Sequence, residues 1–338
     1  MEPNKEPLIS VVLPTYNVAQ YLQQCLESVA AQTYRNIEVI IIIDGATDES
    51  YEIAQDFCKK DKRFSVYWQE NAGSGSARNA GLAHCQGELV MFVDPDDWIE
   101  PELLEKLYEA QSQGNYDLVA SKRSTPLCDK KGKIVRMIPK HYENEIIVGQ
   151  QEVRQAFMRM LEMEMVSNPT QKLYKMALIR NHKIQFPDLR RSQDIVFNYR
   201  YYNHISSLRL IDYSGYNYRK NVQEAIRKTE QNYDKTIVLL YNDYMSLYQM
   251  WSLPFPSQEM CRWFFRTRVY SYLEMMAYKK QNYSKNVEDP VILRIIQNAR
   301  PQKFHLRITR CLLLSKQYTL LNYFLTLIII VKRNGFLG

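Results

Sequence analysis

IIIIDGATDES, residues 40–50, joins an apolar run directly to a cluster of polar residues. Four isoleucines in a row are typical of a strand that is buried on both faces, as the strands of parallel sheets are. The run ends at Asp44 and Gly45, and Thr47 and Asp48 follow at once. In open α/β sheets the ligand lies beyond the carboxyl ends of the strands, where loops present polar groups over a buried scaffold. The stretch therefore predicts an α/β fold with a ligand site at this end of the strand.

Strand and helix patterns alternate through the first 115 residues. ISVVLPTYN, FSVYWQE and GELVMFVDPDD have strand character, and the segments between them have apolar residues at helical spacing. We expect the strands ending near Pro14, Asp44 and Asp94 to bring their polar clusters to one edge of a mostly parallel sheet. Long helical patterns follow in residues 232–251, 257–280 and 303–333. The predicted fold class is α/β with a C-terminal helical region.

Charge is distributed unevenly along the chain. Residues 1–110 contain 8 Lys and Arg against 19 Asp and Glu, whereas residues 111–338 contain 36 against 18. An acidic part suits a metal ion, and a basic part suits phosphate or an anionic membrane surface; solvated faces without a partner are the alternative. No nucleic-acid partner is expected. The N-terminus lacks a basic segment followed by an apolar one, so we expect a cytoplasmic protein.

VMFVDPDDW, residues 90–98, places three carboxylates directly after another apolar run. Asp94, Asp96 and Asp97 repel one another unless a cation lies among them, and carboxylate oxygens suit Mg²⁺ or Mn²⁺. The alternative is a helix cap, because an aspartate before a helix accepts hydrogen bonds from its free N–H groups. One carboxylate is enough for a cap, so the pattern favours a divalent metal site.

NAGSGSARNAG, residues 71–81, has the composition of a glycine-rich loop that leads into a helix. Its glycines permit tight turns or the close approach of a ligand. The spacing fits neither the GxGxxG nor the GxxxxGK[ST] pattern, which argues against a Rossmann or P-loop nucleotide site. Arg78 is a candidate contact to the base or diphosphate of a nucleotide.

ISVVLPTYN, IDGATDES, NAGSGSARNAG and VDPDDW, in this order and spacing, resemble the family 2 glycosyltransferases with the GT-A fold. The resemblance is close over residues 7–115 and weaker to about residue 220. It implies a GT-A catalytic domain over residues 1–225, with a nucleotide-sugar half at about 7–115 and an acceptor half at about 116–225. Residues 226–338 would form a separate helical region.

The resemblance also implies roles for particular residues. In the family a Pro-x-Tyr-Asn turn and an aspartate line the nucleotide pocket, and they correspond here to Pro14, Thr15, Tyr16, Asn17 and Asp44. The other donor-binding positions correspond to Arg78 and to the DxDD carboxylates Asp94, Asp96 and Asp97. Asp96 and Asp97 are expected nearest the ribose and the metal ion, Mn²⁺ or Mg²⁺.

The catalytic base of the family lies in a Gly-Glu-Asp segment before an apolar helix, which corresponds here to Ser192, Gln193 and Asp194. The resemblance implies that Asp194 takes the proton of an acceptor hydroxyl in a single, inverting displacement. Without the resemblance, an aspartate before an apolar run is more typical of a helix cap. Ile43 and Ala46 also replace polar residues of the family. These departures leave a non-catalytic sugar-binding or scaffold subunit as an alternative.

The last apolar segment of the chain is flanked by basic residues. Tyr318–Val331 would be only about 20 Å long as a helix, shorter than the roughly 30 Å hydrocarbon core of a bilayer. Lys316, Lys332 and Arg333 at its ends favour a helix that lies against an anionic membrane surface. A core helix or a homodimer interface is the alternative.

Together, these patterns and the resemblance predict a metal-dependent inverting glycosyltransferase at the inner face of the cell membrane. The expected donor is a nucleotide sugar, in the first place a UDP-sugar. The expected acceptor is a lipid-linked oligosaccharide or polysaccharide in the synthesis of a bacterial surface polysaccharide such as a capsule. A sugar transferase acting on polyprenyl phosphate is the alternative within this class.

Overall fold

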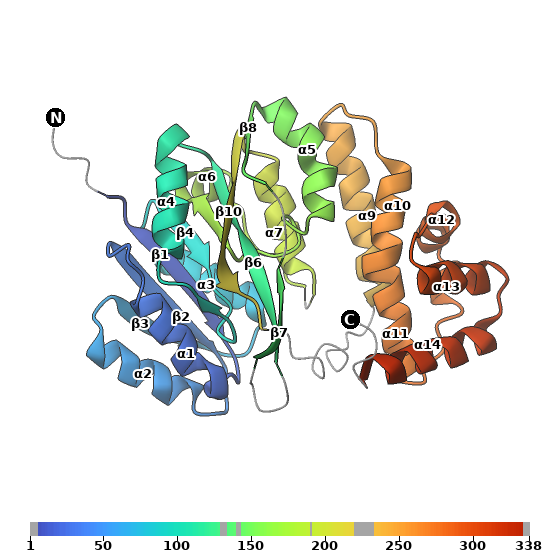
Figure 1. The fold of residues 1–338 in the computed structure, drawn as a ribbon, viewed down its shortest axis with the longest axis horizontal. Coiled ribbons are helices and arrows are strands. Elements are labelled where there is room, and N and C mark those ends of the chain that lie inside the picture. The colour runs from blue at the N-terminus through green and yellow to red at the C-terminus, as the bar shows by residue number, and fades with distance from the viewer. Residues whose placement is uncertain (1–5, 129–133, 140–142, 190, 220–232, 334–338) are drawn as a thin grey trace. The chain divides into compact units, whose positions relative to one another are not determined.

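The chain forms two compact units, Met1–Lys220 and Asn221–Gly338. The computed structural model describes residues 6–128, 134–139, 143–189, 191–219 and 233–333, and Figure 1 shows the path of the chain. The domain border predicted at residues 225 and 226 lies outside the described residues.

Four parallel strands form one half of the sheet in the first unit. Their spatial order is β3 (Phe64–Gln69), β2 (Ile37–Asp44), β1 (Ile9–Thr15) and β4 (Leu89–Phe92). Every residue of β1 is buried, and so is every residue of β2 except Glu38. Burial on both faces explains why these strands are apolar throughout instead of alternating. The predicted α/β class with a mostly parallel central sheet is confirmed in this half.

The other half of the sheet contains strands of both directions. β9 (Lys172–Lys175) pairs antiparallel with β4 and with β6 (Leu118–Cys128), and β10 (Ser207–Asn217) pairs parallel with β6. The remaining described strands, all paired antiparallel, are β5 (Trp98–Ile99), β7 (Ile134–Pro139) and β8 (Glu145–Val148). β6 and β7 form an antiparallel pair with each other.

The helices of the first unit pack on this sheet (Figure 1). They are α1 (Ala19–Ala30), α2 (Ser50–Lys60), α3 (Ser74–His84), α4 (Leu103–Gly114), α5 (Gln150–Glu162), α6 (Met176–Asn181) and α7 (Gln193–Tyr202). α1 is typical, because Leu22, Cys25, Leu26 and Val29 form one buried stripe at helical spacing. α3 begins at Ser74, so most of the glycine-rich segment is helical and not a loop.

The predicted C-terminal helical region is confirmed in the second unit. Its helices are α9 (Tyr233–Met250), α10 (Ser257–Phe264), the π-helix η1 (Phe265–Val269), α11 (Tyr270–Tyr278), the 3₁₀-helix η2 (Asn286–Glu288), α12 (Pro290–Asn298), α13 (Phe304–Leu314) and α14 (Tyr318–Arg333). An aromatic cluster of Tyr241, Tyr244, Trp263 and Phe264 holds α9 against α10. The helical pattern over residues 303–333 is two helices, because Lys316 between them adopts a left-handed conformation with φ of 56°.

Candidate functional site

The carboxyl ends of β1, β2 and β4 lie side by side, as the sequence predicted. The register pairs Thr15 with Ile43, and Val12 with Phe92, so the loops after the three strands leave from one edge of the sheet. The segments 16–18, 44–49 and 93–97 therefore converge there. This edge is the candidate site.

Asp44 organises the loop that precedes α3. Its side chain is 2% exposed, and one carboxylate oxygen accepts hydrogen bonds from Gln69 Nε2 at 2.7 Å and from the Ala72 N–H at 2.8 Å. The other oxygen accepts from the Gly73 N–H at 2.9 Å. Gly73 has a φ of 90°, which glycine adopts without strain. Asp44 thus sets the shape of the loop that leads to Arg78.

The turn after β1 is joined to the turn after β2. The Thr47 N–H donates to Asn17 Oδ1 at 2.8 Å, and Asn17 has a left-handed φ of 49°. Pro14 and Thr15 are buried, whereas Tyr16 is 48% exposed. Of the residues predicted to line the nucleotide pocket, Tyr16 and Asn17 are therefore the ones that face solvent.

Asp48 makes hydrogen bonds that hold the turn after β2. Ala46 in this turn and Ile43 near the end of β2 lack polar side chains. One carboxylate oxygen accepts from the Ala19 N–H at 2.9 Å, and the other accepts from the Ser50 N–H at 3.1 Å. Ile43 is fully buried within the sheet. The apolar residues at positions 43 and 46 therefore do not remove the hydrogen bonds that Asp48 makes in this turn.

Arg78 lies in the second turn of α3 and points toward the carboxylate cluster. Its Nη2 donates to Asp94 Oδ1 at 2.7 Å, and the guanidinium carbon lies 5.4 Å from the centre of the Phe186 ring. Asn79 fixes Phe186 by exchanging two hydrogen bonds with its main chain, at 2.8 and 2.9 Å. Nε and Nη1 of Arg78 are buried and have no hydrogen-bond partner among the residues that the structure describes. Buried donors of this kind are rare in folded proteins, so they mark a place for an acceptor.

Asp97 is the most deeply buried of the three clustered carboxylates, at 1% exposure. One oxygen accepts from the Tyr216 hydroxyl at 2.7 Å, and the other accepts from the Arg219 N–H at 2.7 Å. Burial raises the pKa of Asp97 well above its usual value, and the nearby charges of Asp96 and Asp94 raise it further. The Tyr216 hydroxyl also accepts from the Asp94 N–H at 3.1 Å.

Arg219 also holds the turn that contains Asp94, Asp96 and Asp97, which we call the carboxylate turn. Its Nε donates to the Asp96 carbonyl at 2.9 Å, and its Nη2 donates to Gln24 Oε1 at 2.6 Å. The guanidinium also lies 4.7 Å from the centres of the Tyr21 and Trp98 rings. Sequence reasoning did not find Tyr216 or Arg219, although the run YNYRK at the end of β10 is an aromatic and basic cluster that could have drawn attention.

The carboxylate turn meets the charge requirement of a divalent cation but not the ligand count of a protein-only site. Among the described residues no group of three His, Cys, Asp or Glu side chains is arranged to hold a metal ion. Asp96 is partly exposed, whereas both oxygens of Asp97 already accept one hydrogen bond. Mg²⁺ at nucleotide sites is commonly held by one or two carboxylates, with phosphates and water as the other ligands. The residues present fit a cation of that kind.

Asp194 lies in the first turn of α7, at the start of which the chain is held against α3. Gln193 Nε2 donates to Ser74 Oγ at 2.7 Å, and a Cβ on Gly75 would lie 3.2 Å from Gln193 Cγ. Ser192, before the helix, has a left-handed φ of 64° and makes no side-chain cap. Asp194 accepts from the N–H of Ile195 at 2.9 Å and is partly exposed. The structure thus brings the starts of α7 and α3 together.

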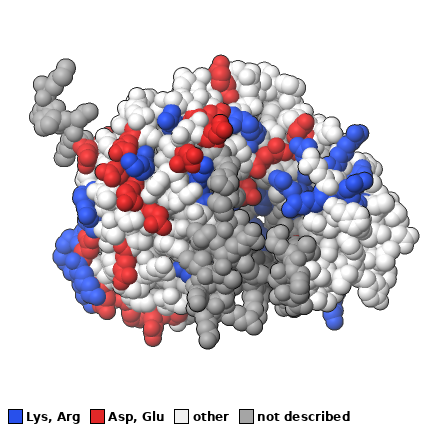
Figure 2. Space-filling view, viewed as in Figure 1, with Lys and Arg blue, Asp and Glu red and all other residues white. Residues whose placement is uncertain are grey.

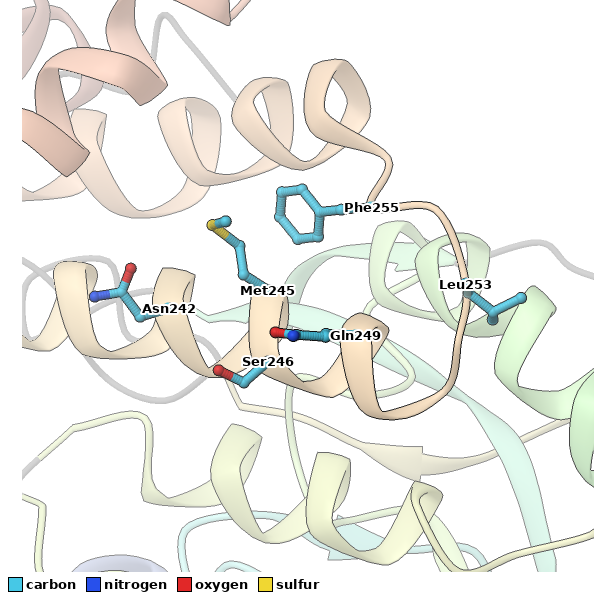
Figure 3. A pocket seen from close by; sticks show the side chains of 6 residues that line it. All are labelled: Asn242, Met245, Ser246, Gln249, Leu253 and Phe255. Atoms are coloured by element: carbon cyan, nitrogen blue, oxygen red, sulfur yellow. The ribbon is translucent and has the colours of Figure 1, made fainter.

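A pocket of ≈ 520 Å³ lies on the second unit, along α9 and the segment after it (Figure 3). Met245 and Phe255 point into the same space in Figure 3. The lining residues are Asn242, Met245, Ser246, Gln249, Leu253 and Phe255. None of them titrates or carries a charge, so this pocket lacks the groups for proton transfer or for binding a diphosphate.

Sequence comparisons give several similar proteins. The sequence model described as Glycosyl transferase family 2 matches residues 10–166. EpsH of Bacillus subtilis is 30% identical over 238 residues, which are 70% of this chain and 67% of EpsH. EpsJ of the same organism is 30% identical over 216 residues, 64% of this chain and 62% of EpsJ. The glycosyltransferase GlyA of Streptococcus pneumoniae is 50% identical over 101 residues, 30% of this chain, and the match spans only 14% of GlyA.

Solved structures of TarS from Staphylococcus aureus have a similar fold. TarS 1–349 in complex with UDP-GlcNAc has a TM-score of 0.64 at 19% identity, and the match covers 97% of this chain and 92% of that one. Without that ligand, TarS 1–349 has a TM-score of 0.60 at 20% identity, covering 97% and 91%. At this level of identity the likeness bears on the fold alone.

Proposed function

The chain belongs to glycosyltransferase family 2, and from this premise we propose that it transfers a sugar from a UDP-sugar to a hydroxyl of a lipid-linked acceptor. The proposal rests on two buried nitrogens of Arg78, Nε and Nη1, which lie beside the carboxylate turn and have no hydrogen-bond partner within the described part of the chain. A diphosphate would accept charge-assisted hydrogen bonds from such a guanidinium. The TarS structure of similar fold contains UDP-GlcNAc, which supports a UDP-sugar as the class of donor.

A divalent ion, Mn²⁺ or Mg²⁺, belongs to this proposal. Asp96 and Asp97 would hold it together with the donor phosphates, and Asp94 would remain paired with Arg78. When bound, the ion offsets the negative charge that develops on the departing diphosphate. Burial is the main cause of the raised pKa of Asp97, and repulsion by Asp96 and Asp94 raises this pKa further. That repulsion supports a cation at this position.

Asp194 is the proposed general base. An acceptor hydroxyl is a weak nucleophile at neutral pH, so a positioned carboxylate must take its proton as the oxygen attacks the anomeric carbon. One displacement inverts that carbon and needs no covalent intermediate on the protein. The contact between Gln193 and Ser74 supports this role, because it holds the start of α7 at the start of α3.

The proposed acceptor is a lipid-linked oligosaccharide in the synthesis of a bacterial surface polysaccharide, reached at the inner face of the cell membrane. No helix within the described ranges is long and apolar enough to cross a bilayer. The basic balance of residues 111–338 supports a peripheral contact with anionic lipid. A non-catalytic sugar-binding subunit is the alternative, and it predicts donor binding without turnover.

A screen of nucleotide sugars with the purified full chain tests the donor and the metal. We expect release of UDP from one UDP-sugar in the presence of Mn²⁺, and loss of donor affinity with EDTA. Arg78→Lys should weaken donor binding about tenfold, since it removes one or more charge-assisted hydrogen bonds of about 1.5 kcal/mol each. The matched control is Arg63→Lys, which alters an arginine paired with Asp61 outside the site. Equal UDP affinity with and without EDTA would exclude the metal from the mechanism.

Asp194→Asn tests the general base. We expect kcat to fall by about a hundredfold or more while the affinity for the donor stays nearly unchanged. Asp289→Asn is the control, because Asp289 caps α12 and has no part in the proposed site. A variant that loses its fold, or one that loses donor affinity but keeps its turnover, would make Asp194 a structural residue.

A further inference from the structure

The last part of the chain contains no acidic residue at all. Residues 290–338 include eight Lys and Arg and no Asp or Glu, although the whole chain has 37 acidic residues. The basic side chains that the structure describes as exposed in this segment are Arg294, Arg300, Lys303, Arg307 and Lys316. In Figure 2 the surface over α12 to α14, at the right of the view, is white and blue. Its charge would attract an anionic surface and repel a second copy of itself.

α14 has two apolar faces, of which only one is used inside the second unit. Leu321, Leu325, Ile328 and Ile329 are buried, where the helix packs on α11 and α13. The opposite face carries Leu320, Tyr323, Leu327 and Ile330, which are 56%, 73%, 58% and 50% exposed. Their spacing of three, four and three residues places them in a single stripe. The core therefore uses only one of the two apolar faces of this helix.

α13 exposes a similar face beside α14. Phe304, Arg307, Cys311 and Leu314 recur at the same helical spacing, and Phe304 is 76% exposed. The opposite face buries Leu306, Thr309 and Leu313. Lys316 lies in the turn between the two helices and is exposed. Its Nζ is 2.9 Å from Glu288 Oε1. The two neighbouring helices thus combine exposed large apolar side chains with basic ones.

We propose that the exposed faces of α13 and α14 bind an anionic bilayer surface, with α14 lying in the interface and not across it. The apolar stripe would enter the boundary between headgroups and acyl chains, and the basic side chains would contact lipid phosphates. This goes beyond glycosyl transfer, although it rests on the proposed function in one respect, since a lipid-linked acceptor requires the enzyme at a membrane. A homodimer would have to bring two acid-free segments together, which is why the bilayer is favoured.

Flotation of the full chain with vesicles tests the proposal, without nucleotide sugar or metal so that the result does not depend on transfer. We expect binding to phosphatidylcholine vesicles that contain phosphatidylglycerol, and at least about tenfold weaker binding to phosphatidylcholine alone. Lys303→Gln with Arg307→Gln should weaken binding to the anionic vesicles at least about tenfold at low salt. Leu320→Ser with Leu327→Ser should weaken it to a similar degree at any salt concentration.

Ile146→Ser with Val148→Ser is the matched control, because both residues are exposed apolar side chains in the first unit. A second measurement leaves the exposed apolar and basic side chains of α13 and α14 in place, so it does not depend on the stability of those variants. An environment-sensitive fluorophore on Cys311, in a Cys58→Ser and Cys128→Ser background, should shift its emission to the blue on anionic vesicles. Absence of flotation at low salt would overturn the proposal. So would a dimer in light scattering that the Leu320 and Leu327 substitutions convert to monomer without any vesicle binding.

Discussion

Tyr216, near the end of β10, and Arg219, just after it, hold the carboxylate turn in place. Asp94, Asp96 and Asp97 could be predicted from sequence because they stand together after an apolar run. Tyr216 and Arg219 could not, because they follow Asp97 by 119 and 122 positions and no periodic pattern marks them. Only the place of β10 in the sheet brings them to the site.

Tyr216→Phe should lower stability more at high pH than at low pH. Burial and the charges of Asp96 and Asp94 raise the pKa of Asp97 in the folded state. Such a carboxyl favours folding below its unfolded pKa of about 3.9, and this contribution is lost as the pH rises through the folded pKa. The Tyr216 hydroxyl opposes the shift by donating to the carboxylate, so its removal raises the pKa further. We expect a loss of about 1–3 kcal/mol at pH values where Asp97 is ionised in the folded state, and this loss shrinks as Asp97 becomes protonated.

Urea unfolding of both proteins over a pH series measures this difference. Tyr201→Phe is the matched control, since the Tyr201 hydroxyl donates to the Asp117 carbonyl at 2.6 Å and accepts from the Lys175 N–H at 2.9 Å. Neither of those partners titrates, so the loss caused by Tyr201→Phe should be constant. The same pH profile in both variants would show that Tyr216 does not act through Asp97.

At the scale of elements, what the sequence predicted depended on length and periodicity. β1, β2, β3 and β4 and the helices between them follow clear patterns and are present. β9 was not expected as a strand, because four residues, KLYK, carry too little pattern to reveal an antiparallel partner between β4 and β6. The glycine-rich segment was expected to be a loop that leads into a helix, yet the helix already begins at Ser74, and its Gly81 lies close against β1 of the sheet.

Gly81→Ala should destabilise the protein through the contact between α3 and β1. A Cβ at residue 81 would lie 2.3 Å from Val12 Cγ1, in a fully buried strand that cannot move aside. Overpacking of this kind costs about 1–3 kcal/mol. Val12→Ala alone should also destabilise, because it leaves a cavity. The double variant should lose less than the sum of the two, and additive losses in urea unfolding would show that this contact does not limit the packing.

At the scale of the whole molecule, the two units differ in charge. Met1–Lys220 contains 27 Lys and Arg against 29 Asp and Glu, whereas Asn221–Gly338 contains 17 against 8. The proposed donor and the proposed membrane surface are both anionic, yet they would be recognised differently. Arg78, the proposed contact of the donor, is 6% exposed, whereas Lys303 and Arg307 are exposed to solvent. Salt screens exposed charges much more strongly than buried ones.

Salt should therefore separate the two activities. Between about 0.01 M and about 1 M salt the Debye length falls from about 30 Å to about 3 Å, which removes most of the attraction between exposed basic residues and a bilayer. We expect binding to anionic vesicles to fall at least about tenfold over this range. The dissociation constant of the donor at saturating Mn²⁺ should change by only about threefold or less, since its contacts are buried. Flotation and equilibrium dialysis on the same protein samples measure both. If the two affinities fell in parallel, the donor and the lipid would share one exposed basic surface. The assignment of donor binding to the first unit and lipid binding to the second would then be wrong.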